Sequence, residues 1–446
     1  MRTRRLSRRD LALPIRWLGL ALRAILGFPV RAAAGTAGRV QDPARQVADY
    51  WRAERSTVRQ GFISNFISVL TSLISGLTLA AMDDRLLSIK GLFVLIPVSI
   101  GMRGNIFGAL SARLGSAIHS GLFEVSSEKR APLYQNAYAS TVLTLATSAT
   151  MGVLARAIAG LVGINTVSVW DFIAIAVLGG VLSSAVVLAF TVALSIVSFR
   201  RSWDLDSVGA VLVTVAGDVV TLPALVLASY IAGIRWVTPI VGAACLLIGA
   251  YALARGWSSR HLLARRIVRE SFPVLCVAMV LDILAGAVVE PRMGAVFTAF
   301  PAFLILIPGF LENTGALGSI LAARLGTKLH LGAVSPNAKP EAPAILDGTI
   351  VLALGAFVYT FSAVTSLALA AATDKAYPGV GLFLAVALLG GLIAMMLAAL
   401  IGYYAAILSY RFGFDPDNHT VPLVTSGMDL LGVICLVVAL VLLGVA

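Results

Sequence analysis

Long apolar stretches alternate with short polar ones along nearly the whole chain after residue 60. A helix needs about 20 apolar residues to cross a hydrocarbon core about 30 Å thick, and eleven stretches approach or exceed that length. The connections between them are short, so the pattern predicts an all-α membrane protein of about 11 transmembrane helices. The expected spans cover residues 61–82, 91–112, 135–162, 170–199, 208–233, 237–254, 271–294, 299–323, 347–373, 378–409 and 421–445.

The composition agrees with this pattern and excludes an ordinary soluble domain. Hydrophobic residues make up 59% of the chain and charged residues 13%, against about one quarter charged residues in soluble domains. The net charge of +12 could suggest nucleic acid binding, but the basic residues are concentrated at one side of the predicted membrane topology. The charge therefore reports membrane orientation, and we expect membrane lipid but no nucleic acid as a partner.

The first 60 residues hold 13 Arg and only four acidic residues, which predicts a basic cytoplasmic leader. Within it, residues 14–31 are apolar but carry Arg16 and Arg23 on one helix face. We interpret this segment as an interfacial amphipathic helix, because a span here would place an Arg-rich flank outside. Eleven spans then place the C-terminus outside, in a plasma or inner membrane protein.

The chain contains an internal repeat at an offset of 211 residues. Ile96-Pro97 matches Ile307-Pro308, and Arg113-Leu114-Gly115 matches Arg324-Leu325-Gly326. The repeat predicts four parts: the leader at 1–60, a first membrane repeat at 61–234, a linking helix and basic turn at 235–269, and a second repeat at 270–446. Because the linking helix restores direction, the two five-helix repeats should be parallel and related by a pseudo-two-fold axis along the membrane normal.

An aspartate recurs in the last helix of each repeat. Asp218 and Asp429 lie 12 residues into their helices, hence about 18 Å along the axis and near the bilayer midplane. Thr214 and Thr425 precede them by one turn and share their helix faces. Membrane carboxylates are costly and mostly functional, so the pair suits a divalent cation; the alternative is that each is protonated or hydrogen-bonded for structure.

Further acids stand at the predicted cytoplasmic ends of the same two helices. Asp206 and Asp417 could concentrate cations in a vestibule, or they could simply cap the helices, as aspartate does well without a ligand. The sequence leaves these two interpretations open.

The second span of each repeat combines Pro, Gly and polar residues. Pro97 and Pro308 could break these helices and free carbonyls for an ion, although packing of small residues would also explain the glycines. Asn105 is a candidate pore residue. Arg103 and Glu312 could form an ion pair between the repeats; if Glu312 is unpaired, it becomes a third cation ligand.

These motifs resemble the MgtE superfamily, and specifically solute carriers with two fused MgtE-like units. Asp415-Pro416-Asp417-Asn418, followed by Thr425 and Asp429-Leu430-Leu431-Gly432, is similar to the final-helix signature of that family. The resemblance covers about residues 60–446. It implies transport of Mg²⁺ or a related divalent cation through an axial pore, with Asp218 and Asp429 holding the ion and Asn105 in the second-span Asn position. Ala316 stands where the second repeat would carry that Asn.

The sequence thus predicts a divalent cation transporter or channel, not an enzyme, that uses no cofactor and moves Mg²⁺ through a pore formed by one chain as a pseudo-dimer. Oxygen ligands without clustered Cys or His favour Mg²⁺ over softer metals. One alternative is an exchanger coupled to H⁺ or Na⁺. Another is an intramembrane di-aspartyl protease, but Val215-Ala216-Gly217-Asp218 lacks the first Gly of that motif.

Overall fold

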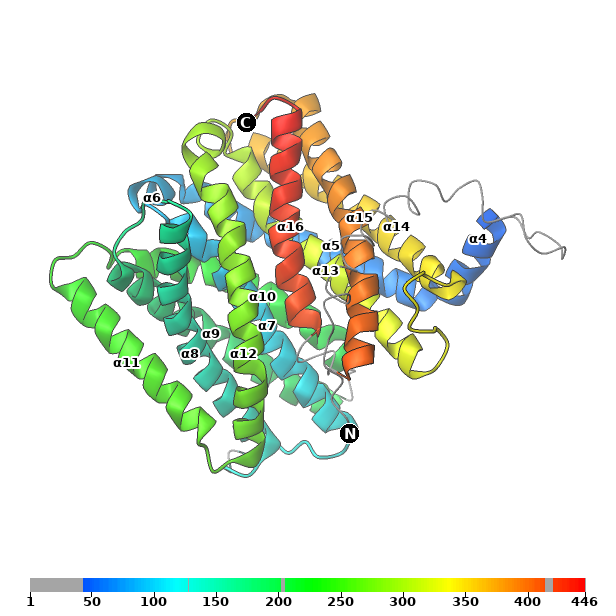
Figure 1. Cartoon of the computed structure of the whole chain (residues 1–446), viewed down its shortest axis with the longest axis horizontal. Helices are drawn as coiled ribbons and strands as arrows, with labels where there is room; N and C mark the ends of the chain where they lie inside the picture. Colours follow the sequence, from blue (N-terminus) through cyan, green and yellow to red (C-terminus); the bar gives the residue numbers. More distant parts are fainter. Residues whose placement is uncertain (1–42, 127, 202–204, 414–419, 446) are drawn as a thin grey trace, which may run out of the picture. The chain divides into compact units, whose positions relative to one another are not determined.

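The computed structural model describes residues 43–126, 128–201, 205–413 and 420–445 (Figure 1). It divides into two units, residues 1–55 and 56–446, which are considered separately. The predicted interfacial helix at 14–31 lies outside the described residues. In the first unit, helix α4 (Pro43–Ala53) is amphipathic and carries an exposed ion pair between Arg52 and Asp49.

The second unit contains 11 helices long and apolar enough to cross a membrane within the described ranges, which confirms the predicted number. Five form each repeat, and α11 links them. The first repeat comprises α5 (Arg55–Ala81), α7 (Leu92–His119), α8 (Pro132–Leu161), α9 (Val169–Arg201) and α10 (Leu205–Ser229). The link is α11 (Val237–Trp257), and the second repeat comprises α12 (Leu262–Val289), α13 (Ala302–His330), α14 (Ala342–Ala372), α15 (Val380–Phe412) and α16 (Val421–Leu442).

Equivalent helices of the two repeats make equivalent contacts at the 211-residue offset. In the first repeat, Arg113 donates from Nε to Asn136 Oδ1 at 2.9 Å; in the second, Arg324 donates from Nε to Asp347 Oδ1 at 3.0 Å. Six spanning helices separate the start of one repeat from the start of the next, so matching helices run in the same direction. The predicted two-repeat, parallel design is confirmed.

The first helix of each repeat packs on the other repeat. Helix α12 lies against α7 and α8. Its counterpart α5 approaches the second repeat so closely that a β-carbon at Gly76 would lie 2.1 Å from the carbonyl oxygen of Ile305 on α13. Each also contacts the last helix of its own repeat: Ser75 donates to the backbone oxygen of Asp218 on α10, while α12 runs beside α16 (Figure 1). The two repeats therefore interlock.

The linking helix α11 packs mainly on the first repeat, against α8 and α9, and less extensively on α12. Glycines seven residues apart form its contact face. A β-carbon at Gly249 would lie 2.5 Å from Cβ of Ala149, and one at Gly242 would lie 2.7 Å from the backbone oxygen of Trp170. Small residues let membrane helices approach closely, so this face docks α11 tightly.

The expectation that the proline-containing spans are broken is wrong. Helices α7 and α13 run continuously through Pro97 and Pro308. Each proline lies in the second turn of its helix, so only one hydrogen bond to the first turn is lost, where the backbone can adjust. These helices offer side chains, not free carbonyls, to a site.

Candidate functional site: an acidic cluster between the repeats

The last helix of each repeat carries its aspartate into the interior. Asp218 on α10 is 3% exposed and Asp429 on α16 is 7% exposed. Helix α10 packs on α7 and α16 packs on α13, and a β-carbon at Gly315 on α13 would lie 3.1 Å from Asp429 Oδ1. The two carboxylates are close enough for the charge of Asp429 to act on Asp218. The two repeat-equivalent acids therefore lie within electrostatic range of each other.

The two predicted threonines stand at the same register but in different surroundings. Thr425 shares a hydrogen bond of 2.9 Å with the hydroxyl of Ser319, and a β-carbon at Gly315 would lie 2.9 Å from its methyl group. Thr214 is half-buried, and a β-carbon at Gly104 would approach its methyl group only to 3.9 Å. The second repeat therefore packs its threonine more tightly than the first.

Glu312 joins the cluster from α13. Its carboxyl group lies within hydrogen-bonding reach of the Asp218 carboxyl, and its Oε1 accepts a hydrogen bond of 2.9 Å from Ser68 on α5. Asp218 and Glu312 therefore form a pair of carboxyl groups across the interface between the repeats, with Asp218 on the first repeat and Glu312 on the second.

The predicted ion pair between Glu312 and Arg103 is wrong. Arg103 is buried, but its guanidinium points into its own repeat, where Nε donates to Ser183 at 3.1 Å and Nη2 donates to Ser148 at 3.3 Å. A β-carbon at Gly180 would lie 2.8 Å from Nη2, so this glycine makes room for the side chain. The long arginine side chain reaches α8 and α9 because Ser148 and Ser183 accept its hydrogen bonds and Gly180 leaves space for the guanidinium group.

A fourth acid, Asp282, completes the cluster from α12. It is fully buried, and it lies close enough for its charge to act on Asp429. Ser426, one turn before Asp429, faces the Asp282 carboxyl without completing a hydrogen bond of regular geometry. Four carboxyl groups from four helices, α10, α12, α13 and α16, thus share one buried region.

Several oxygens of this cluster have no hydrogen-bond partner. They are Asp218 Oδ2, Asp429 Oδ1 and both oxygens of Asp282. Among the described residues, no three Asp, Glu, His or Cys side chains converge closely enough to form a direct metal cage. Buried, unpartnered carboxylate oxygens without such convergence suit an ion held partly through its own water molecules.

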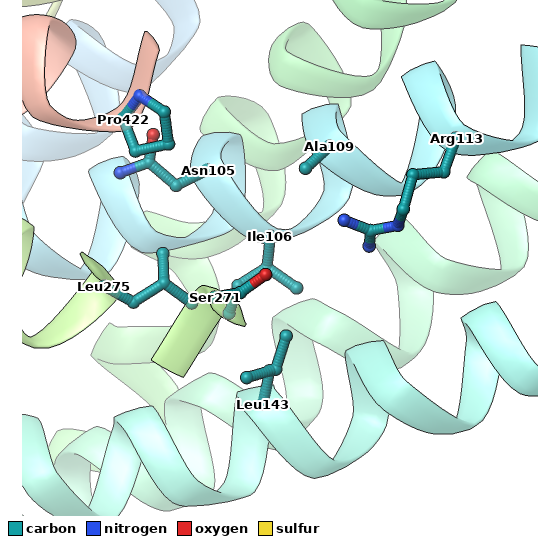
Figure 2. A pocket seen from close by; sticks show the side chains of 8 residues that line it. All are labelled: Asn105, Ile106, Ala109, Arg113, Leu143, Ser271, Leu275 and Pro422. Carbon is teal, nitrogen blue, oxygen red and sulfur yellow. The ribbon is translucent and has the colours of Figure 1, made fainter. Parts of the chain in front are cut away.

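Asn105 lies beside the cluster, at a small cavity of about 10 Å³ between α7, α8, α12 and the start of α16 (Figure 2). Its amide nitrogen donates to Ser426 at 3.5 Å, a long hydrogen bond that connects it to the Asp429 helix. The cavity has room for about one water molecule, and Ser271 and Arg113 also line it. Asn105 is therefore placed near Asp429 through Ser426.

Of the acids predicted at the helix ends, Asp417 lies outside the described residues. Asp206 lies in the first turn of α10, but its side chain is not among those described. The choice between a vestibule and helix capping therefore remains a prediction for both.

The sequence argument missed Ser68 and Ser426, and it assigned no role to Asp282. Asp282 is visible in the sequence as an acid inside a span, but no motif surrounds it. Serines are common in membrane helices, so Ser68 and Ser426 carry no distinguishing signal. Comparing the first helices of the two repeats in space would have pointed to Asp282, as described below.

The duplicated helical bundle with acids buried at its centre defines an integral membrane transport protein. The family model MgtE, described as a divalent cation transporter, matches residues 96–228 and 307–439. The chain belongs to this MgtE family of divalent cation transporters. Both matched regions begin after the first helix of their repeat, so α5 and α12 lie outside them.

Two relatives with 22% sequence identity are named as solute carriers. Solute carrier family 41 member 3 of Mus musculus is 22% identical over 372 residues, which cover 77% of this chain and 73% of that protein. Solute carrier family 41 member 2 of Gallus gallus is 22% identical over 394 residues, covering 80% of this chain and 64% of that protein. No solved structure gives a significant match.

Proposed function

We propose that this chain transports Mg²⁺ across the cell membrane along a polar path between its two repeats, with Asp218 and Asp429 binding the ion near the midplane. The observation that carries the proposal is the set of buried carboxylate oxygens without hydrogen-bond partners on these two aspartates. A carboxylate that is structural in a membrane normally pairs with donors or a basic group.

Mg²⁺ fits the chemistry of these residues. It gives up its water reluctantly and is usually held by one or two carboxylates while retaining several waters. Glu312 would add a third acid beside Asp218, and Thr214, Thr425 and Asn105 would accept hydrogen bonds from the bound waters. Asp206 and Asp417 would attract the ion at the cytoplasmic mouth, with the N-terminus inside and the C-terminus outside.

The test is Mg²⁺ flux into proteoliposomes for the wild type and for Asp218→Asn and Asp429→Asn. Neutralising either aspartate should reduce flux at least tenfold. Asp374→Asn is the matched control, because Asp374 is an exposed residue outside the bundle with φ of 54°, a conformation that Asn accepts readily. Undiminished flux in both bundle variants would remove the proposed site.

A coupled mechanism is the second candidate, because four acids exceed the charge of one divalent cation. An H⁺ or Na⁺ gradient would then drive Mg²⁺ movement. Uphill Mg²⁺ accumulation on imposing either gradient in the same proteoliposomes would favour the exchanger, whereas flux that follows only the Mg²⁺ gradient and voltage would favour a channel.

A further inference from the structure

The first helix of each repeat, α5 or α12, packs on the other repeat, and we call these two the exchanged first helices. They create two equivalent interfaces between the repeats, α5 with α13 and α12 with α7. Their register is fixed by two close backbone contacts. A β-carbon at Gly76 would touch the backbone of Ile305, and one at Gly286 would lie 2.8 Å from the backbone of Val94. Ile305 and Val94 are equivalent at the 211-residue offset, so Gly76 and Gly286 are equivalent at an offset of 210. The first helices are thus shifted by one residue relative to the rest of the repeat.

Each of these interfaces contributes one acid to the buried cluster, and the two acids come from opposite helices; a further acid, Glu290, accepts from the backbone of Gly91 and Phe93 at the end of the second interface. In the first, Glu312 on α13 faces Ser68 on α5. In the second, Asp282 on α12 faces α7 at Gly101, where a β-carbon would lie 2.6 Å from Asp282 Oδ2. Gly101 is the repeat-equivalent of Glu312, and Ser72 is the equivalent of Asp282 in the register of the first helices. The acid has changed helices while staying in the same interface.

The surroundings of Asp282 do not satisfy it structurally. It is fully buried, and neither of its oxygens has a hydrogen-bond partner. Its charge acts on Asp429, as that of Glu312 acts on Asp218. Glu312 thus reaches Asp218 from the other repeat, whereas Asp282 reaches Asp429 from the first helix of the same repeat, and Glu312 also acts on Asp429.

We propose that Asp282 is a ligand of the transported divalent cation, which supplies to Asp429 the second carboxylate that Glu312 supplies to Asp218. The proposal rests on the proposed function and deepens it by completing the site in the second repeat. With both of its carboxyl groups ionised, each pair would carry two negative charges and thereby match a divalent cation. Gly101 is required because any side chain at this position would occupy the space of the Asp282 carboxylate.

The first experiment measures Mg²⁺ affinity by calorimetry and flux in proteoliposomes for Asp282→Asn. This substitution keeps the shape of the side chain and removes its charge. We expect Mg²⁺ affinity to fall at least tenfold, with an unchanged melting temperature in the absence of divalent cations. Unchanged affinity and flux in this variant would overturn the proposal.

The second experiment moves the acid back to the other helix. Asp282→Ser alone should lose affinity, and the double variant Gly101→Glu with Asp282→Ser should recover most of it, because it copies the arrangement of Glu312 and Ser72. Gly101→Glu alone should be the least stable of the three, since both acids would compete for one space. A folded double variant no better than Asp282→Ser alone would argue against the equivalence of the two interfaces.

The same assays separate this proposal from the proposed function. If Asp218→Asn and Asp429→Asn abolish flux while Asp282→Asn does not, the cation site stands without Asp282. If none of the three changes affects affinity or flux, the proposed function itself fails. If all three reduce Mg²⁺ affinity while Asp374→Asn does not, both are supported.

Discussion

The hydroxyl groups of Thr314 and Tyr359 lie 2.6 Å apart between α13 and α14, at the register where Arg103 reaches Ser148 in the first repeat. Thr314 is the equivalent of Arg103, and Tyr359 is the equivalent of Ser148. The large side chain therefore comes from the earlier helix in one repeat and from the later helix in the other. Gly180 and its equivalent Gly391 each make room for the large member, Arg103 or Tyr359.

This exchange predicts coupled stability effects. Arg103→Thr should leave unfilled space, and Ser148→Tyr should overpack, each lowering the free energy of unfolding by about 1–3 kcal/mol. The double variant should lose at least about 1 kcal/mol less than the sum of the singles, because it recreates the pair found in the second repeat. Denaturation in detergent measures this coupling, and strict additivity would contradict it.

Two equivalent glycines should respond differently to the same substitution. Gly315→Ala would place a methyl group 2.9 Å from the Thr425 methyl group and 3.1 Å from Asp429 Oδ1. Thr425 is held by Ser319 and cannot turn away freely, so Mg²⁺ affinity should fall severalfold. Gly104→Ala meets only an ordinary contact at 3.9 Å and should leave affinity unchanged. Calorimetry on both variants checks the contrast, and equal responses would contradict it.

The stability cost of neutralising Asp347 should depend on whether its second cationic partner, Lys328, is present. Asp347 is fully buried and accepts from Arg324 Nη2 at 2.6 Å and Lys328 Nζ at 2.7 Å. Asp347→Asn should lower the free energy of unfolding by about 2–4 kcal/mol. This is less than for a fully buried ion pair, because both cations are partly exposed. Adding Lys328→Ala should recover part of this loss, since the result copies Arg113 with Asn136, where the equivalent of Lys328 is Ala117.

Melting temperatures of Asp347→Asn, Lys328→Ala and the double variant, measured in one detergent, test this prediction. Lys328→Ala alone serves as the control and should cost less than Asp347→Asn, because Arg324 still neutralises the aspartate. A double variant less stable than Asp347→Asn would show that the lysine stabilises this region by other contacts.

The docking face of α11 should tolerate no enlargement. Gly249→Val would force a side chain against Ala149 and the backbone of Leu145, and should lower the melting temperature by several degrees. Ala250→Val adds volume on the exposed face of the same helix and should have little effect. Equal melting temperatures for the two variants would contradict the proposed role of this face.

Much of the architecture follows from the sequence alone. Helix number and repeat order depend on hydropathy and spacing, and the burial of Asp218 and Asp429 follows from their depth in apolar helices. The partner of a buried side chain depends instead on which helix it faces. Arg103 could reach a remote acid or nearby serines, and only the packing of α7 on α8 and α9 distinguishes them.

Asp282 illustrates the same limit more sharply. Its helix lies against the other repeat, and the first helices match at an offset of 210 where the remaining helices match at 211. A constant offset therefore pairs Asp282 with Thr71 instead of Ser72 and conceals its relation to Gly101 and Glu312. One residue of slippage rotates a helical position by about 100°, which is enough to assign it to the wrong face.

The exchanged first helices also constrain how the protein is made. Ser68 and its partner Glu312 are 244 residues apart in the chain. At about 5–20 residues per second of synthesis, α5 waits roughly 12–50 s after emerging before its binding surface on α13 exists. During that interval its polar positions Ser68 and Ser72 must remain in the bilayer or at the insertion machinery without their final neighbours on α13. We therefore expect a chain truncated after α11 to be retained by quality control as an unassembled intermediate, so that neither half of this duplicated protein is a free-standing folding unit.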